Sequence, residues 1–514
     1  MPTDVGKLYP LGEKLCGGEE PYPQYDKSLV IQNPADTSLV QLLLRIKSTT
    51  GNSGLGRTFF PLGSVEQIIT PHIVTEEITK GRDLLAKPLT DEHIHDYAQR
   101  VCFKGEQSLC RIFAILAMLQ RPWEVVNFID ERISDIDLPL KTVTPSTNYM
   151  VRLQNPRTHG TLCSLGAFSH EQFQHLQWTM VPASFPKDTP HLRFDRRQAM
   201  PWSEEWYFNE RYKSYAYLSR VRIHDAHHFF EHPYLLDGIF ALKTFTSYHG
   251  SSSSSAIEEL EAKADEVHSP SSLQTRQHFD RELKWLQGVA KFNHPHLRPF
   301  FAAYEHGDQS CLLFPWADAH LKLLWNNTTA GPPLERPSLM WLVKQFRGLA
   351  DALQIFYTSV RNLDSHDRLP EIQGGISAYH ILGYRDPNRA DCATNATAYT
   401  LVLSGFDNSM PSETYQPPER NTQGNKASAS DDVWSLGCIM LETIAWFVGG
   451  GEYVGKLLHC RKKPDVLNGG VLSAKFYSYV REPEARGDGP IFARVDVGVH
   501  DVSGFYSDTS PVLR

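Results

Sequence analysis

The stretch Asp432-Val433-Trp434-Ser435-Leu436-Gly437-Cys438-Ile439-Met440-Leu441-Glu442 decides the fold expected for this chain. It is a mostly apolar run with an acidic residue at each end. A second short segment, Tyr415-Gln416-Pro417-Pro418-Glu419, precedes it. The order of the two segments and the interval between them carry the fold assignment of the C-terminal half.

The composition is that of a folded, soluble protein. With 514 residues the chain suits two or three domains, each able to bury a core. Its hydrophobic share of 41% and its aromatic share of 11% are typical of globular rather than disordered chains. The net charge of −8, from 51 basic and 59 acidic residues, gives no reason to expect nucleic acid or an anionic membrane as the main partner.

The cysteines predict a reducing compartment. Eight are scattered without a C-x-x-C pair, namely Cys16, Cys102, Cys110, Cys163, Cys311, Cys392, Cys438 and Cys460. Because the N-terminus also lacks the apolar core of a signal peptide, they predict reduced thiols in a cytoplasmic or nuclear protein. No apolar run reaches the roughly 20 residues needed to cross a bilayer. The nearest, Leu109 to Leu119, is interrupted by Arg111 and is expected to be a core helix.

Residues 1–205 are predicted to form a mostly α-helical module, because apolar residues recur there at a spacing of three to four. One such run extends from Val101 to Leu119 and another from Val125 to Ile133. Pro122 is expected to start the second helix because its φ is fixed, and Asp135 to Pro139 to end it.

Residues 206–316 are predicted to form a β-rich lobe with one helix. Tyr215 to Ile223 and Gly238 to Phe245 have the composition of strands. Residues from about 246 to 272 are a serine-rich insertion with too little apolar surface to pack. The helix is expected near Gln277 to Val289.

Residues 317–514 carry helical signals as far as about residue 448. Met340 to Tyr357 is an amphipathic helix with one apolar stripe, formed by Leu342, Phe346, Leu349, Leu353 and Phe356. From Gly449 to Arg514 the chain is poorly periodic and interrupted by glycines.

The two segments quoted first resemble parts of the eukaryotic protein-kinase superfamily. Asp432 to Glu442 is similar to the buried central helix of the kinase C-lobe, and Tyr415 to Glu419 to the turn that closes the activation segment. His294-Pro295-His296-Leu297 resembles a kinase turn, and Cys311 to Trp316 resembles the last N-lobe strand and the hinge.

This resemblance implies an α+β, bilobal protein-kinase-like fold from about Tyr212 onward. A β-rich N-lobe and a helical C-lobe, atypical after about residue 449, would follow the mostly α-helical N-terminal module. Glu171 to Trp178 resembles a segment that precedes kinase-like domains in filamentous-fungal proteins.

A protein kinase holds ATP with a glycine-rich loop, a strand lysine paired with a helix glutamate, and two metal-binding residues, while an aspartate orients the substrate hydroxyl. Lys243 matches the lysine and Glu282 the glutamate. The resemblance implies that the two side chains pair and are the candidate nucleotide contacts. The alternative is a solvated strand lysine and a solvated helix glutamate.

The glycine-rich loop has no counterpart between Tyr217 and Asp237, where glycine is absent. His224 to Phe230 is expected to occupy its place. These histidines predict a surface turn rather than a metal site, because no carboxylate or cysteine completes a recognisable ligand spacing.

The segment that resembles the catalytic loop keeps its apolar residues but not its catalytic ones. In Gln373 to Leu382, Gly375 stands in place of the base aspartate. Ser377 stands in place of the phosphate-contacting lysine, and His380 in place of the metal-binding asparagine. Loss of a positioned base alone lowers a rate by about 10² to 10⁴.

The second metal-binding position is also replaced. Gly405 stands where the magnesium-binding aspartate is expected, and Asp407 follows two positions later. Asp407 is expected to be a turn residue, with a displaced metal ligand as the alternative. The sequence therefore predicts no catalytic residue and no metal site.

The residues that remain are those that kinase folds use as a scaffold, namely Glu419, Asp432, Trp434 and Gly437. In the family, Asp432 would anchor the catalytic-loop backbone and Glu419 would meet an arginine near the C-terminus. Arg461, Arg481 and Arg486 are the candidates for that arginine.

Three hypotheses follow. The first is a catalytically inactive pseudokinase that binds or regulates another protein. The second is an atypical or weak Ser/Thr kinase, in which Lys243, Glu282 and Asp407 still hold ATP, with or without magnesium. The third is a decayed gene whose C-terminal end no longer completes the fold.

Overall fold

The computed structural model describes residues 38–495 except 47, 50–57, 86, 145–146, 153–166, 188–190, 208–215, 236, 246–269, 328–330, 362–375, 387–395, 405–412, 422–428, 466–468 and 485–486. They form two compact units. The first contains the chain up to Glu231 with Asp237–Thr244 and Ala302–Cys311, and the second contains the remainder. Each unit combines helices and strands, so the chain is an α+β protein.

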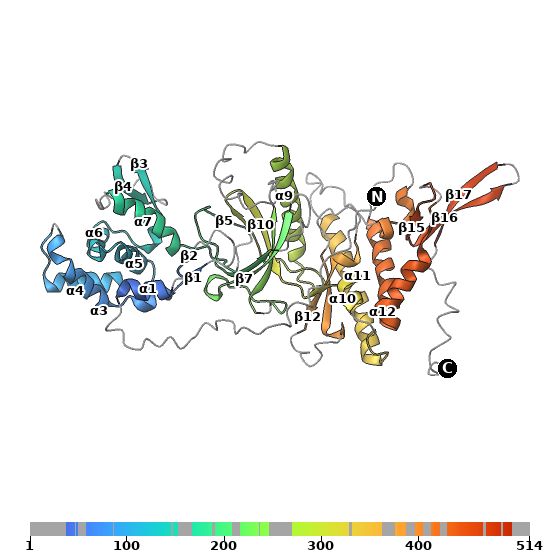
Figure 1. The fold of residues 1–514 in the computed structure, drawn as a ribbon, viewed down its shortest axis with the longest axis horizontal. Helices are drawn as coiled ribbons and strands as arrows, with labels where there is room; N and C mark the ends of the chain where they lie inside the picture. The colour runs from blue at the N-terminus through green and yellow to red at the C-terminus, as the bar shows by residue number, and fades with distance from the viewer. Residues whose placement is uncertain are drawn as a thin grey trace. The chain divides into compact units, whose positions relative to one another are not determined.

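The first unit begins with a helical module built around one apolar core (Figure 1). Its helices are α1 (Leu39–Ile46), α2 (Ser64–Ile68), α3 (Pro71–Lys80), α4 (Asp91–Val101), α5 (Cys110–Met118), α6 (Val125–Asp130) and α7 (Ala167–Met180). Seven of the nine residues of α5 are buried, which confirms the predicted core helix. The start of the second predicted helix is also confirmed, because a short 3₁₀ turn (Pro122–Glu124) leads directly into α6, but α6 ends at Asp130, before the expected end at Asp135 to Pro139.

Short strand pairs accompany these helices. They are β1 (Ser48–Thr49) with β2 (Thr58–Phe59), and β3 (Leu140–Thr144) with β4 (Thr147–Arg152). Both pairs are antiparallel. The module is therefore mostly helical, as the periodicity predicted.

A six-stranded mixed sheet follows, in the order β5-β9-β10-β8-β7-β6. Its strands are β5 (His191–Phe194), β6 (Trp202–Tyr207), β7 (Ala216–Ile223), β8 (Ile239–Phe245), β9 (Ala302–His306) and β10 (Gln309–Pro315). β6 and β7 are antiparallel, whereas β5 is parallel to β9. The structure confirms the predicted strands as β7 and β8. Sequence patterning missed β5 and β6, which are short and carry charged or polar residues.

The second unit contains the helices α9 (Pro270–Ala290), α10 (Leu321–Asn327), α11 (Arg336–Arg361) and α12 (Ala429–Arg461), which Figure 1 shows. α10, α11 and α12 contribute to the core that holds the fully buried Trp325 and Trp446, whereas Trp285 and Val289 of α9 pack in a separate cluster with Phe356 of α11. A three-stranded sheet joins β11 (Ala319–His320), β12 (Ile381–Arg385) and β13 (Tyr399–Leu403). The helices predicted near Gln277 to Val289 and Met340 to Tyr357 are confirmed within α9 and α11. Most of the serine-rich insertion lies outside the described residues.

α12 contains a sharp break. Gly449 and Gly450 are not helical, and Gly450 has φ 68° and ψ −165°, a conformation limited essentially to glycine. A second helical segment then continues to Arg461. The sequence predicted no regular structure after Gly449, and this prediction is wrong for the segment up to Arg461. The run of glycines obscures the sequence signal of the helix that follows it.

The chain after α12 forms short strands and a hairpin. These are β14 (Lys463–Pro464), β15 (Leu472–Ser473), β16 (Tyr477–Glu484) and β17 (Gly487–Val495). β14 pairs with β15 and β16 with β17, both antiparallel. The described part of this region therefore continues as strands rather than as further helices.

Only one face of α12 is buried. Asp432, Leu436, Ile439 and Trp446 lie on the buried face, which confirms the prediction of a core helix for that face. The opposite face carries exposed apolar side chains, so the prediction is wrong there. α12 is also long and apolar enough to cross a membrane, contrary to the sequence expectation, yet half of its most apolar window is buried, as in a core helix.

Candidate functional site

Lys243 and Glu282 are both withdrawn from solvent. Lys243 lies on β8 with 2% of its surface exposed, and Glu282 lies on α9 with 7% exposed. The alternative of a solvated lysine and a solvated glutamate is therefore wrong for each residue. Their pairing stays a prediction, because the two residues belong to different units.

The turn at Ser377 to His380, which the kinase resemblance compares with the catalytic loop, is closed on itself. Ala378–His380 is a single 3₁₀ turn, and Nδ1 of His380 accepts a hydrogen bond from the Ser377 backbone N–H at 3.1 Å. The Ser377 hydroxyl lies 3.2 Å from the same nitrogen. Nδ1 of His380 and the polar groups of Ser377 are therefore engaged in contacts within the turn. Gly375, Gly405 and Asp407 lie outside the described residues.

The end of β13 lies against this turn. Ser404 donates twice to the His380 carbonyl, from its backbone N–H at 2.9 Å and from its hydroxyl at 3.0 Å. The residues that immediately precede Gly405 are thus fixed beside the turn. The turn at His380 and the end of β13, to which the kinase resemblance assigns the metal-binding positions, therefore meet in the fold.

The turn His294 to Leu297 is held against the same strand. The Leu403 N–H donates to the His296 carbonyl at 2.8 Å, and Nδ1 of His296 donates to the Leu401 carbonyl at 2.6 Å. Burial lowers the pKa of His296, which favours the neutral ring. A Cβ on Gly348 of α11 would lie 2.1 Å from that ring, so only glycine fits there. Sequence reasoning had no signal for this close approach.

The histidine-rich segment after β7 is not a surface turn. His227 is fully buried, and its Nδ1 donates to the Ala183 carbonyl at 2.9 Å. Its Nε2 accepts from the Leu62 N–H at 3.1 Å, and its ring packs edge-on against Phe59. Burial lowers the pKa of His227 to about 4. The ring is therefore a neutral, fully hydrogen-bonded link between the helical module and the sheet.

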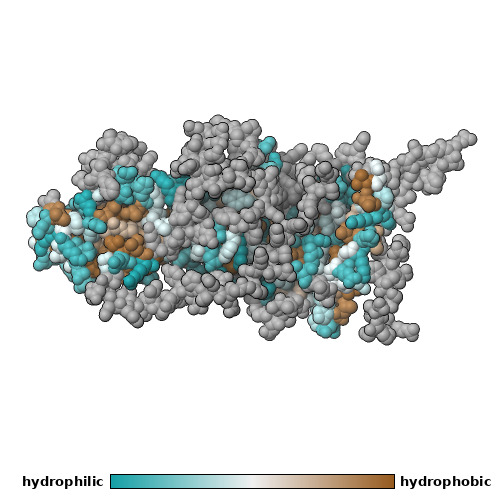
Figure 2. All heavy atoms as spheres, viewed as in Figure 1, coloured by the Kyte–Doolittle hydropathy of each residue, from teal (hydrophilic) through white to brown (hydrophobic). Residues whose placement is uncertain are grey.

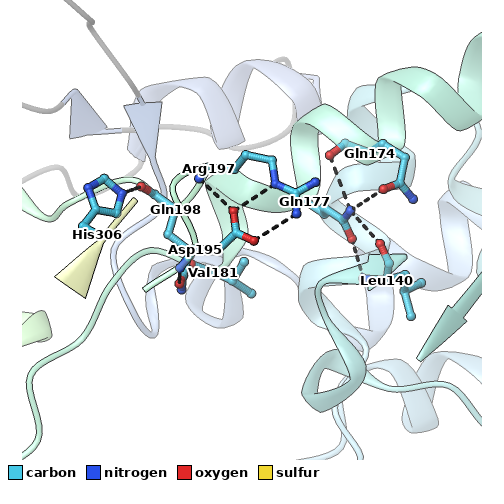
Figure 3. Close-up of polar contacts among 8 residues, drawn as sticks. All are labelled: Leu140, Gln174, Gln177, Val181, Asp195, Arg197, Gln198 and His306. Carbon is cyan, nitrogen blue, oxygen red and sulfur yellow. Dashed lines mark hydrogen bonds and ion pairs between the residues drawn. The ribbon is translucent and has the colours of Figure 1, made fainter. Parts of the chain in front are cut away.

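The Glu171 to Trp178 segment has a structural role. Gln177 of α7 is fully buried, and its side-chain amide bonds both backbone groups of Leu140 (Figure 3). The oxygen accepts from the N–H at 2.7 Å, and the nitrogen donates to the carbonyl at 3.0 Å. The same nitrogen donates to the Gln174 side chain at 2.9 Å. This amide therefore fixes the start of β3 to α7.

A second set of contacts in the same view connects α7 to the sheet (Figure 3). Arg197 makes a bidentate ion pair with Asp195, with both N–O distances 2.9 Å, and its guanidinium lies 4.2 Å from the Trp178 ring centre. The ion pair lowers the pKa of Asp195. His306 of β9 donates to the Gln198 carbonyl at 3.1 Å. These contacts are structural, and none presents a reactive group.

The C-terminal unit contains a buried ionic cluster. Nη2 of Arg461 bonds one carboxylate oxygen of Glu442 at 2.7 Å, and the Tyr415 hydroxyl donates to the other at 2.6 Å. The side chain of Arg461 is fully buried, and 4% of that of Glu442 is exposed. The guanidinium stacks on Phe476, 3.8 Å from the ring centre. Burial, followed by the Glu442 charge, raises the pKa of Tyr415, so its hydroxyl remains a donor.

This cluster accounts for one of the three arginines expected as the partner of Glu419, and that partner stays a prediction. Glu419 lies on a short 3₁₀ segment (Pro418–Asn421) and is exposed, whereas Arg461 pairs with Glu442. The side chain of Arg481 and all of Arg486 lie outside the described residues. Arg461, one of the three candidates, therefore pairs with a carboxylate of α12 instead.

The other scaffold residues have distinct environments. Asp432 is buried and accepts a hydrogen bond from the Tyr357 hydroxyl of α11. Its expected contact with the catalytic-loop backbone stays a prediction, because the first part of that loop, 373–375, lies outside the described residues. Trp434 is partly buried and packs edge-on against Tyr477. A Cβ on Gly437 would have no neighbour within 4 Å, so packing does not require glycine there.

The exposed face of α12 carries an uncharged apolar stripe. Val433, Leu441, Ile444 and Val448 are exposed by 60%, 39%, 44% and 53%. They lie at spacings of eight, three and four residues, which places them on one side of the helix. Figure 2 shows hydrophobic atoms on the surface of the helical part of this unit.

No model of a known protein family matches the chain. No curated protein sequence matches it significantly either. Fold and site are therefore argued from the chain alone.

Proposed function

We propose that the chain from about Tyr212 onward is a catalytically inactive, bilobal protein-kinase-like domain that acts as a binding or regulatory scaffold for another protein. The order of the elements supports this fold. β6, which begins before the expected boundary at Tyr212, is followed by β7 and β8 and then by α9. Lys243 lies on the third of these three strands, where protein kinases carry their lysine. α10, α11, the β12–β13 hairpin and α12 then follow in the order that the kinase resemblance implies.

The self-closed turn at Ser377 to His380 carries the proposal of inactivity. A phosphoryl-transfer site must present a base, a phosphate-binding cation and metal ligands toward the substrate. Here the hydroxyl and the imidazole nitrogen are engaged with each other and with the turn backbone. Nδ1 of His380 has its lone pair committed to an amide, so it is not offered to a metal ion.

The absence of a glycine-rich loop also supports inactivity. The strand order assigns the position of this loop to the connection between β6 and β7, and not to His224 to Phe230 as expected from the sequence. If β8 is the lysine strand, the hairpin that covers the phosphates is β6–β7, and its connection spans residues 208–215. That sequence, Phe-Asn-Glu-Arg-Tyr-Lys-Ser-Tyr, contains no glycine. Side chains at these positions would obstruct the approach of backbone amides to phosphates.

A protein partner is supported by the surface of α12. Nucleic acid is recognised largely through basic groups that neutralise phosphates. The exposed stripe of α12 offers none, and the whole chain carries a net charge of −8. An uncharged apolar face of this kind complements a protein surface.

Phosphotransfer assays with the full chain test inactivity directly. Purified protein should transfer no phosphate above background with magnesium, and Gly375→Asp should not restore activity, because Gly405 and His380 still leave the metal without its ligands. Lys243→Met should leave association with protein partners in cells unchanged. Lys291→Met, at an exposed lysine just after α9, is the matched control.

A weak Ser/Thr kinase is the second candidate, favoured by the burial of Lys243 and Glu282. Nucleotide binding should then be detectable by calorimetry or thermal shift, with and without magnesium. Phosphotransfer that Lys243→Met abolishes and Lys291→Met leaves intact would overturn the scaffold proposal. Asp407 would then be tested as a displaced metal ligand.

A further inference from the structure

A short hairpin after α12 is held by its backbone and exposed at its end. β14 and β15 pair antiparallel, and beyond them the Asp465 N–H donates to the Val471 carbonyl at 2.9 Å. The Gly470 N–H donates to the Asp465 carbonyl at the same distance. Gly469 and Gly470 adopt positive φ of 59° and 81°. Hydrogen bonds therefore fix the backbone on both sides of this end.

The residues at the end of the hairpin face solvent. We call residues 462–464 and 469–472 the hairpin tip, and each of them is exposed. Val471 and Leu472 have 60% and 65% of their surface exposed. Pro464 lies directly opposite Leu472 in the strand register. The tip therefore carries apolar side chains on both sides of the hairpin.

The charged groups of the tip are basic. Lys462 and Lys463 are both exposed. Asp465 is the only acidic residue from 462 to 475, and it turns inward with 8% of its surface exposed. Its Oδ2 lies 3.1 Å from Nζ of Lys475, in a pair whose side chains are 6% and 9% exposed. The acidic charge is thus neutralised inside the unit, whereas both lysines of the tip are at the surface.

Apolar and basic groups in one tip are complementary to an anionic lipid surface. Exposed apolar residues mark protein or membrane contacts, and lysines are attracted to anionic headgroups. A protein interface is anchored by side chains that fill pockets, and the described residues of the tip form none, because all of them are exposed. A fluid bilayer needs no pocket, and lysine stems extend so that the ammonium group stays at the headgroup level.

The net charge of the chain does not oppose such a contact. The value of −8 belongs to all 514 residues. At physiological ionic strength, exposed charges more than about 8 Å apart are largely screened from each other. The charge of the tip itself therefore governs its interaction with a membrane.

We propose that the hairpin tip docks on an anionic lipid surface. Val471 and Leu472 enter the boundary between headgroups and acyl chains, while Lys462 and Lys463 contact the anionic groups of the lipids. A single contact of this size gives weak, reversible binding. The proposal does not depend on the kinase-like function, because the tip lies outside every segment that was compared with a kinase site.

Sedimentation of the full chain with vesicles tests the proposal. The chain should bind phosphatidylcholine–phosphatidylserine vesicles and stay in the supernatant with vesicles of phosphatidylcholine alone. Lys462→Gln with Lys463→Gln should lower the affinity for the anionic vesicles about fivefold for each lysine removed. Lys291→Gln with Lys344→Gln, at exposed lysines elsewhere in the unit, is the matched control and should bind as the wild type does.

The apolar part of the tip has a variant of its own. Val471→Ser with Leu472→Ser should lower the affinity at least about tenfold, although the charge is unchanged. Leu339→Ser with Val343→Ser, at apolar residues of α11 that are each 53% exposed, is the control. All of the substituted side chains are exposed, so the thermal unfolding of each variant should match that of the wild type.

Hydrogen exchange then locates the contact. Exchange in peptides that contain residues 469–472 should slow when anionic vesicles are added. Absence of binding to these vesicles, or equal binding to both kinds of vesicle, would overturn the proposal. So would a loss of binding in the lysine variant with none in the Val471→Ser, Leu472→Ser variant, because charge alone would then explain the contact.

Discussion

Replacing Glu442 with glutamine should destabilise the second unit strongly, because it leaves the Arg461 charge buried and unpaired. The substitution keeps the shape of the side chain and removes its charge. The Arg461 side chain is fully buried, and among the described residues its Nε and Nη1 have no hydrogen-bond partner. Breaking one side of a buried ion pair costs about 3–5 kcal/mol of unfolding free energy.

The matched control lies on the same helix. Glu452 and Lys456 form an ion pair with the same 2.7 Å N–O distance, but their side chains are 69% and 50% exposed. Glu452→Gln should leave stability unchanged within error, because solvent screens that pair. The two substitutions share their chemistry and differ in burial.

Urea unfolding with hydrogen exchange provides the measurement. With an m-value of roughly 2–3 kcal/mol/M, the loss at Glu442 should lower the midpoint by roughly 1–2 M. Exchange should rise in peptides from α12, which assigns the loss to this unit. Arg461→Met combined with Glu442→Gln should recover part of the loss, because no unpaired charge then remains buried. Equal effects of Glu442→Gln and Glu452→Gln would refute the reasoning.

Gly450→Ala should cost about 1–3 kcal/mol in urea unfolding because of its left-handed φ, whereas Gly437→Ala on the same helix should be neutral or stabilise by about 0.5–1 kcal/mol. A loss at Gly437 would contradict the open space there. Burial lowers the pKa of His227 from 6.5 to about 4, so the unfolded state binds a proton more readily than the folded state. The free energy of unfolding should therefore fall by roughly 3 kcal/mol as the pH falls from 6.5 to 4. His227→Phe should reduce this change of the urea midpoint with pH. An unchanged pH dependence would show that other groups cause it. Gln177→Ala should cost roughly 2–4 kcal/mol by calorimetry, because both backbone groups of Leu140 lose their partner; a loss no larger than that of a surface substitution would contradict this.

Sequence patterning predicted the elements whose signal is local. The repeating apolar residues of α5 and α11 predict which face of each helix is buried, because a helix returns to the same face every three to four residues. Strand composition predicted β7 and β8 for the same local reason. The departures from the kinase pattern that the resemblance assigns to Gly375, Ser377 and His380 also need no structure, since they depend only on residue identity.

The tertiary structure alone decided which distant groups meet. Glu442 and Arg461 are 19 residues apart, which is about 28 Å along a straight helix, yet they bond at 2.7 Å. They meet because the chain breaks at Gly449 and Gly450 and folds back. His227 likewise appeared to be a surface histidine, since its partners Leu62 and Ala183 lie far from it in sequence. A pattern of residues fixes local conformation, but long-range partners follow only from how the chain returns on itself.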